Sequence, residues 1–346
     1  MSSLTSLLRR YSQVYPVGSA GARFPRSLKQ RRRAHLDALA KADTFALFAG
    51  VPREPGAENI WHMNAWKLFQ EPALMHLTGI NQPNVILALV PGGIPRFCDA
   101  EVLFLPEKNP EREFWDGVRF GVPAASAKAA AKAPSSDLAD IRALTGISDI
   151  RPLGAFDEWF EGLVKRWKKG RGPARGQAFW HRYVDEKGKV LETRTDHNFA
   201  FRQKLEKLAR GVRKDFVLES CAALHYRLRL PLDRDQVRDV ERAVEITRAA
   251  FVETLPRVHA LRTETELEAL LQYGMLRRSP FGLAFPSIIA GGRNATVLHY
   301  LKNDEALPEN GLVLMDFGAR YGTMHADITR VFPRGGRFNP LQALLY

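Results

Sequence analysis

Cysteine is scarce in this sequence of 346 residues, which contains only Cys98 and Cys221 at widely separated positions. Two distant cysteines form neither a disulfide framework nor a cysteine metal pair, and their scarcity favours a reducing compartment. Long apolar runs are also missing. The longest uninterrupted one, residues 85–90, is far shorter than the roughly 18 residues that a membrane-spanning helix needs. These absences exclude a disulfide-stapled scaffold and predict no helix that crosses a membrane.

Acidic residues are missing from two segments, although the proportions of 45% hydrophobic and 26% charged residues are ordinary for a globular protein. Residues 1–36 contain eight lysines or arginines and no acid, and residues 165–175 contain six and no acid. The net charge of +13 therefore resides in these segments. We expect both to be solvated. The alternatives are contact with an anionic partner such as nucleic acid and, for residues 1–25, a mitochondrial presequence instead of the N-terminus of a cytoplasmic protein.

The first two thirds of the chain alternate between helical and strand-like patterns. Residues 34–42 have the spacing of an amphipathic helix, and residues 110–117 are compatible with another. Apolar runs typical of buried strands occur at 44–50, 85–90 and 101–105. Alternation of this kind predicts a layered α/β domain. We place this domain at residues 34–230, after a basic N-terminal extension at residues 1–33.

The last third begins with helical patterns and ends with strands. A helix is predicted at residues 235–255, where apolar side chains lie along one side. Thr263 and Glu266 have the spacing of a capping box for a second helix that ends near residue 278. Strands are then predicted at 287–290, 296–300, 311–317 and 321–332. Helices followed by paired strands predict an α+β domain, which we place at residues 231–346.

Two aspartates in the last pair of strands are the first candidates for a functional site. If Tyr321 and Gly322 form a two-residue turn, Asp316 lies directly opposite Asp327, with Cβ atoms roughly 4.5–5.5 Å apart. Two carboxylates so close repel each other, and a shared proton or a bound cation must compensate. Two metal ions about 3.5–4 Å apart can be bridged by such carboxylates. If the register is shifted by one residue, the carboxylates lie on opposite faces and form no such site.

His299 is the second candidate, in the segment ATVLHYLKN just before the hairpin. A neutral imidazole on a strand at this place could hold a substrate or a reacting oxygen. The alternative is an ordinary structural histidine beside an apolar run. His325 shares a face with Asp327 by the period of two and is a further possible metal ligand.

The sequence resembles aminopeptidase P, the Xaa-Pro aminopeptidase family of the pita-bread metallopeptidases, in the segments PSIIAGGRNATVLHYLKN and LVLMDFGARYGTMHADITRVFP. The resemblance rests on a His, an Asp 17 residues later and an Asp 11 residues further within Asp-Ile-Thr-Arg. The family's first catalytic-domain helix resembles DQVRDVERAVEITRAAF, and its Glu-x-Trp-x-Gly-x-Arg pattern matches REFWDGVRFG. Its N-terminal signature resembles FQEPALMHLTGINQPNVILAL, with His76 where the family usually has Tyr and Gln82 where it has Glu.

The resemblance implies an α/β N-terminal domain like that of creatinase and prolidase, followed by the first half of an α+β pita-bread catalytic domain. It implies that Asp316 and Asp327 are metal ligands and that His299 binds substrate or shuttles a proton. The cofactor would be a divalent metal, typically two Mn²⁺ in the complete enzyme. The reaction would be hydrolysis, by a metal-activated water, of the bond between an N-terminal residue and a following proline. The implied partners are peptides with proline in the second position, and the implied assembly is a homo-oligomer.

The family also has ligands that this sequence does not contain. It supplies one His and two Glu further along, whereas the sequence stops at Tyr346, 19 residues after Asp327. We therefore expect the chain as written to be inactive by itself. We expect a fragment of a complete enzyme, and the alternatives are a degenerate relative and a site completed by a partner chain. Two other functions stay open: a prolidase-type dipeptidase, and a non-catalytic pita-bread module that binds protein or nucleic acid.

Overall fold

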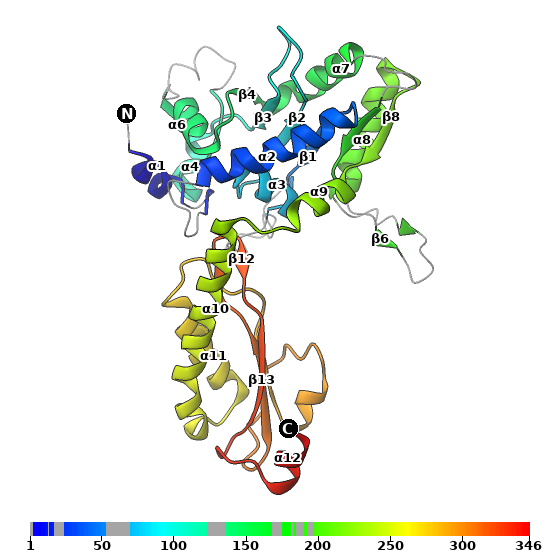
Figure 1. Ribbon diagram of the computed structural model, residues 1–346. Helices are drawn as coiled ribbons and strands as arrows, with labels where there is room; N and C mark the ends of the chain where they lie inside the picture. The colour runs from blue at the N-terminus through cyan, green and yellow to red at the C-terminus, as the bar shows by residue number, and fades with distance from the viewer. Residues whose placement is uncertain are drawn as a thin grey trace. The chain divides into compact units, whose positions relative to one another are not determined.

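The computed structural model divides the chain into two compact units, Met1–Leu232 and Asp233–Tyr346 (Figure 1). The structure describes residues 3–12, 14–16, 24–52, 70–123, 136–167, 175–180, 183–184, 190–191 and 197–346. Within these ranges, no helix is long and apolar enough to cross a membrane.

A six-stranded mixed sheet forms the centre of the N-terminal unit, in the order β4-β3-β2-β1-β5-β8. Strand β2 pairs with β1 and with β3, and both pairs are antiparallel. The other neighbouring pairs, β3 with β4, β1 with β5 and β5 with β8, are parallel. The strands are β1 (Ala46–Ala49), β2 (Ile86–Leu89), β3 (Glu101–Leu105), β4 (Asp149–Pro152), β5 (Arg175–Ala178) and β8 (Val217–Ser220). The first three lie where the apolar runs of the sequence predict strands.

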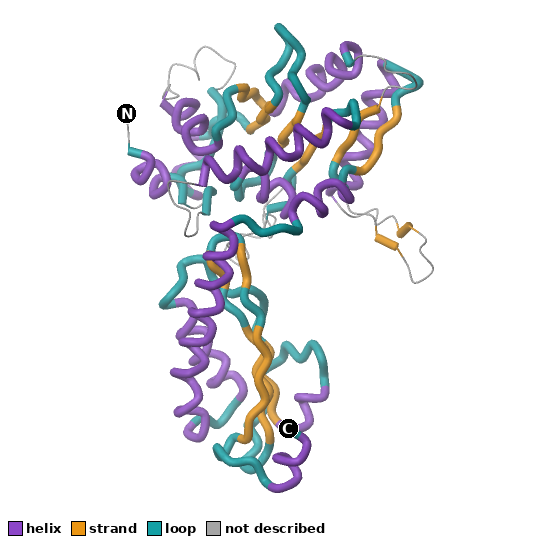
Figure 2. The backbone as a smooth tube through the Cα atoms, in the orientation of Figure 1, coloured by secondary structure: helices purple, strands orange, loops and turns teal. Residues whose placement is uncertain are grey.

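Helices cover both faces of this sheet, because alternate residues of its strands point to opposite sides (Figure 2). Phe48 packs with one set of helices and Leu47 with the other. The first set comprises α1 (Leu4–Arg10), α2 (Phe24–Lys41), α3 (Pro72–Thr78), α6 (Ser136–Thr145) and α9 (Ala222–Arg229). The second set comprises α7 (Phe156–Arg166) and α8 (His197–Val212). The smaller elements are α4 (Pro110–Asp116), the 3-10 turn η3 (Leu153–Ala155), β6 (Tyr183–Val184) and β7 (Val190–Leu191).

The first helix packs into the core, which differs from the solvated basic extension expected at residues 1–33. Leu7, Tyr11 and Tyr15 are buried, and the Tyr15 hydroxyl donates a hydrogen bond to Leu144 O at 2.7 Å. Burial of a large apolar side chain stabilises a fold by about 1.5–3 kcal/mol. The apolar residues between the arginines therefore decide where this segment lies. The boundary expected at the end of the extension falls inside α2.

One arginine of the basic N-terminal segment has a structural role. Arg32 is fully buried, and its guanidinium donates to Leu77 O at 2.9 Å and to Thr145 O at 2.8 Å. It also pairs with Glu101 at 3.2 Å. The two carbonyl groups end α3 and α6, where a positive charge is favourable. Arg32 thus joins the C-terminal ends of two helices to the sheet.

The second basic segment, residues 165–175, is described only at its ends. Lys165 and Arg166 close α7, and Arg175 begins β5. Arg175 pairs with Glu219 at 3.1 Å. The expectation of a solvated segment falls on residues 168–174, which lie outside the described residues.

The second unit packs two helices on one face of a three-stranded antiparallel sheet, in the order β13-β10-β9. Its helices are α10 (Arg234–Thr254) and α11 (Glu264–Leu276), and the capping box expected at Thr263 is present. Its other elements are η4 (Leu255–Ala260), β9 (Ile288–Gly291), η5 (Gly292–Thr296), β10 (Leu312–Phe317), β11 (Arg320–Tyr321), β12 (Met324–His325), β13 (Ile328–Pro333) and α12 (Pro340–Leu345). Both helices and the strand β10 lie where the sequence predicts them.

Two predicted strands of this unit are wrong. Residues 296–300 form the end of η5 and a turn, because the chain leaves the sheet at Gly292, whose φ is 51°. The strand predicted at residues 321–332 is divided into β12 and β13 by Ala326 and Asp327. Both differences concern the segments that carry the candidate site residues.

Candidate functional site

The aspartate pair lies where β10 meets β13. Asp316 is directly opposite Thr329, so the pairing of Asp316 with Asp327 expected from the sequence is wrong by two residues. The cause is the turn, which begins at Gly322 and ends at Thr323, one residue later than predicted. Because the shift is an even number of residues, every side chain stays on the face that the sequence predicts.

The two carboxyl groups and His299 are close enough to interact in the folded chain. Burial raises the pKa of the Asp316 carboxyl, and the charge of Asp327 and a hydrogen bond between the two carboxyl groups raise it further. Thr329 Oγ1, which donates to Asp316 Oδ1 at 2.9 Å, and the nearby His299 act in the opposite direction. Repulsion between like charges is the condition that a divalent cation between them would relieve.

Gly318 allows the hairpin strands to approach at this place. In the register of the hairpin it falls opposite Asp327, and Ala326 N–H donates to Ala319 O at 3.0 Å. A Cβ atom on Gly318 would lie only 1.7 Å from Ala326 O. Sequence reasoning missed this residue. The available signal was a glycine inside a strand pattern, which often marks a close backbone approach.

The carboxylate of Glu264 anchors the loop that carries His299. Glu264 is fully buried in the first turn of α11. Its oxygens accept hydrogen bonds from four groups of the loop: Gly291 N (2.7 Å), Asn294 Nδ2 (3.0 Å), Tyr300 OH (2.7 Å) and Glu305 N (3.1 Å). His299 itself is exposed in the turn. Sequence reasoning missed Glu264 because an acidic residue after a helix N-cap is usually solvated.

Replacing Glu264 with glutamine is expected to lower the free energy of unfolding of the second unit by about 1–2 kcal/mol, because an amide nitrogen cannot accept the hydrogen bonds that a carboxylate oxygen accepts. Trypsin should then cleave at Arg293 faster than in the unaltered chain. Thermal unfolding followed by circular dichroism and a timed digest measure the two effects. Glu309→Gln, at an exposed position, is the matched control. Equal digestion rates for the two variants would contradict the anchoring role.

Two carboxylates are only part of a metal site. Among the residues that the structure describes, no group of three or more His, Cys, Asp or Glu side chains could hold a metal ion. His325, the further ligand suggested by the sequence, is exposed and lies opposite Arg320 in the β11–β12 pair. The structure therefore brings together two carboxylates, Asp316 and Asp327, without a third candidate ligand among the described residues.

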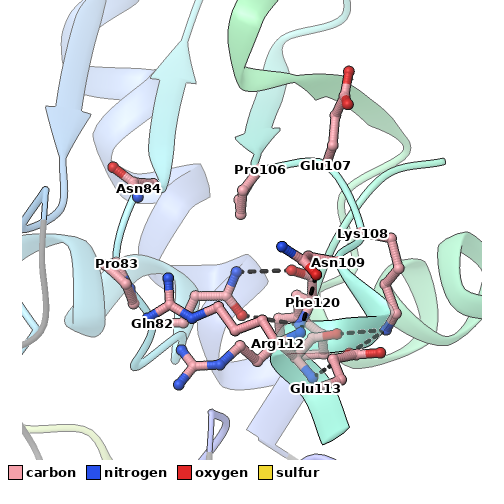
Figure 3. A pocket seen from close by; sticks show the side chains of 11 residues that line it. Gln82, Pro83, Asn84, Pro106, Glu107, Lys108, Asn109, Arg112, Glu113 and Phe120 are labelled. Carbon is pink, nitrogen blue, oxygen red and sulfur yellow. Dashed lines mark hydrogen bonds and ion pairs between the residues drawn. The ribbon is translucent and has the colours of Figure 1, made fainter. Parts of the chain in front are cut away.

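The signature segments of the N-terminal unit line a cavity of about 180 Å³ (Figure 3). Gln82 Nε2 donates to Phe120 O at 2.7 Å, and Phe120 N–H donates to Gln82 Oε1 at 2.9 Å. Glu113 accepts from Arg119 N–H at 2.7 Å and pairs with Lys108 at 2.6 Å. A carboxylate in place of Gln82 could donate only when protonated. These side chains therefore hold the backbone around the cavity in place.

Two family models match the chain. "Aminopeptidase P, N-terminal domain" matches residues 28–145, and "Metallopeptidase family M24" matches residues 238–346. The curated relatives include Xaa-Pro aminopeptidase 3 of Mus musculus, 29% identical over 80% of this chain and 48% of its own length. Another is the Xaa-Pro aminopeptidase of Haemophilus influenzae, 26% identical over 80% of this chain and 54% of its own length. The chain thus spans about half the length of the curated relatives it matches.

Solved structures agree with these matches. Aminopeptidase PepP of Pseudomonas aeruginosa is 26% identical, with a TM-score of 0.68 over 92% of this chain and 64% of its own. Aminopeptidase P from E. coli in its low pH form has a TM-score of 0.72 over the same shares, and its 19% identity shows the fold alone.

The second unit therefore carries the segment of an M24 metallopeptidase, a class of hydrolases that depend on divalent metal ions. Because an aminopeptidase P N-terminal domain precedes it, the chain belongs to the aminopeptidase P family. The fold class predicted from the sequence, an α/β domain followed by part of a pita-bread catalytic domain, is confirmed.

Proposed function

We propose that this chain belongs to a metal-dependent aminopeptidase that hydrolyses the bond between an N-terminal residue and a following proline. The observation that carries the proposal is the interacting pair of Asp316 and Asp327, with His299 beside it, inside the segment that the M24 model matches. The names of the relatives, which are Xaa-Pro aminopeptidases, support the choice of substrate and favour this activity over a prolidase-type dipeptidase.

Asp316 and Asp327 would hold the divalent metal, which we propose to be two Mn²⁺ ions. Two carboxylates of like charge on one face of the hairpin are suited to hold a divalent cation. When bound, the metal supplies Lewis-acid chemistry that polarises the scissile carbonyl and activates water. His299 would hold the substrate or move a proton at its imidazole, and Glu264 keeps the turn of His299 in place. Because the described residues supply no third ligand, we expect the chain by itself to bind metal weakly and to be inactive.

Calorimetric titration of the chain with Mn²⁺ tests the ligand assignment. Weak binding is expected for the unaltered chain and none for Asp316→Asn or Asp327→Asn, since each change removes a charge that attracts the cation. Asp304→Asn is the control, because Asp304 is exposed and pairs with Lys302. Equal heats for all four proteins would refute the assignment. A chain that binds Mn²⁺ through these residues but never cleaves an Ala-Pro peptide would favour the non-catalytic binding module, which the incomplete ligand set supports.

We also propose a cellular location, partners and an assembly for the protein. We propose a cytoplasmic protein, because removal of residues 1–25 as a presequence would strip Leu7, Tyr11 and Tyr15 from the core. A mitochondrial location is the alternative, and one relative is named "Intermediate cleaving peptidase 55, mitochondrial" of Arabidopsis thaliana. Peptides are the proposed partners, in a homo-oligomer. A contact of the basic segments with nucleic acid is a weaker alternative, since Arg32 is already satisfied within the fold.

A further inference from the structure

Arg320 is a buried cation without a counter-charge among the residues that the structure describes. Only 7% of it is exposed, and its Nε and Nη1 atoms are buried without a hydrogen-bond partner. Burial alone lowers its pKa, and no carboxylate acts in the other direction. An arginine stays charged even so. A buried charge without a partner is strongly unfavourable, so a position of this kind points to an anionic group that completes it.

Other arginines of the chain have partners for their charge. Arg32 of the N-terminal unit is equally buried, yet it has Glu101 and two backbone carbonyls as partners. In the second unit, Arg278 pairs with Glu253 at 2.7 Å. Both of these arginines have a carboxylate partner. Arg320 differs from them because none of the described carboxylates pairs with it.

The backbone holds Arg320 in a defined place on the candidate site's hairpin. Its N–H donates to Gly282 O at 3.1 Å, and its carbonyl accepts from Ser279 Oγ at 2.6 Å. By register, Arg320 is on the face that also carries Asp316 and Asp327. Arg320 follows Asp316 by four residues, a separation of about 13 Å along an extended strand. It follows Gly318, the residue opposite Asp327, by two residues, which is about half that distance.

We propose that Arg320 anchors a carboxylate-binding subsite for the C-terminal end of a short peptide substrate. The proposal rests on the proposed function, which places the peptide's N-terminal end at Asp316 and Asp327. An extended tripeptide spans about 10 Å, which lies within the separations estimated above. A guanidinium is the side chain best suited to a carboxylate, because it can donate two parallel hydrogen bonds. Peptides of three residues with a free carboxyl group are then the favoured class.

Thermal unfolding of the full chain without metal tests the subsite independently of catalysis. Arg320→Met is expected to raise the unfolding temperature of the second unit, because it removes an uncompensated buried charge. Sodium acetate is expected to raise that temperature by about 4 °C in the unaltered chain and to leave the variant unchanged. Arg330→Met, at an exposed arginine of β13, should behave as the unaltered chain does. A lower unfolding temperature for Arg320→Met, or equal acetate effects in all three proteins, would overturn the proposal.

A second arm identifies the source of the carboxylate. Ala-Pro-Ala with a free carboxyl group should stabilise the unaltered chain at a concentration about tenfold lower than its C-terminal amide needs, and Arg320→Met should remove this difference. If acetate stabilises but the two peptides act equally, the subsite does not take the substrate's end and the proposal fails. Because no arm requires metal or turnover, loss of the proposed peptidase activity would leave these results unaffected.

Discussion

Replacing Gly318 with alanine is expected to lower the free energy of unfolding of the second unit by about 3 kcal/mol. The added Cβ atom would lie 1.7 Å from Ala326 O, which is a backbone atom and cannot rotate away. The strands must separate, so Asp327 moves away from Asp316. The same variant should therefore lose the weak Mn²⁺ binding of the chain together with its stability.

The positions of the tryptophans allow a loss of stability in the second unit to be distinguished from a loss of stability in the whole chain. All six tryptophans lie in the N-terminal unit, so their fluorescence reports that unit alone. Gly318→Ala should shift the unfolding transition followed by circular dichroism and leave the tryptophan transition in place. Gly335→Ala is the matched control, because a Cβ atom there meets nothing within 4 Å. If Gly318→Ala and Gly335→Ala unfold alike, the close approach of the strands has no energetic importance.

Local patterns in the sequence predicted much of the fold because they depend on neighbouring residues. The capping box of Thr263 needs only Glu266 three residues later, and the structure contains it. The apolar run at 101–105 has enough β-branched and aromatic character to form a buried strand, and it does so with the predicted bounds. Each of these features is decided within about one turn or one strand of chain.

The remaining features depend on contacts between distant residues. Val297 and Leu298 favour a strand by propensity, yet the anchoring of Tyr300 by Glu264, 36 residues away, holds this segment in a turn. The hairpin register was wrong by two residues because the turn begins at Gly322, whose φ of 58° the sequence alone does not specify. The faces of the aspartates were nevertheless predicted correctly, since side-chain alternation survives an even shift.

A cluster of buried histidines gives the N-terminal unit a second property that sequence patterns do not reveal. His35, His76 and His225 come from α2, α3 and α9, and each is at most 8% exposed. His35 Nδ1 lies 2.9 Å from Arg31 O and must donate to it, so in the neutral ring Nε2 accepts from His225 Nδ1, 3.1 Å away. The rings of His76 and His225 meet edge to face, with centroids 5.6 Å apart.

Protonation of His35 and His76 is unfavourable in the folded state. Burial lowers the pKa of His76 to about 2, and its electrostatic interactions with Arg31, His225, Arg229 and His35 lower it further. Burial also lowers the pKa of His35. The unfolded chain has an ordinary histidine pKa of about 6.5. Above that pH neither state is protonated. Below it only the unfolded state takes up the proton, so stability is lost as the pH falls from about 6.5 towards about 2.

Acidification from about pH 7 to about pH 5 is therefore expected to lower the free energy of unfolding of the N-terminal unit by about 2 kcal/mol through His76 alone, with a further loss through His35. Urea unfolding followed by tryptophan fluorescence measures this loss directly. His76→Phe should remove about one proton from the pH dependence and leave the behaviour above about pH 7 unchanged. A variant that loses as much stability on acidification as the unaltered chain would show that His76 takes up its proton in the folded state. Burial would then be outweighed by a compensating movement of the α3 helix.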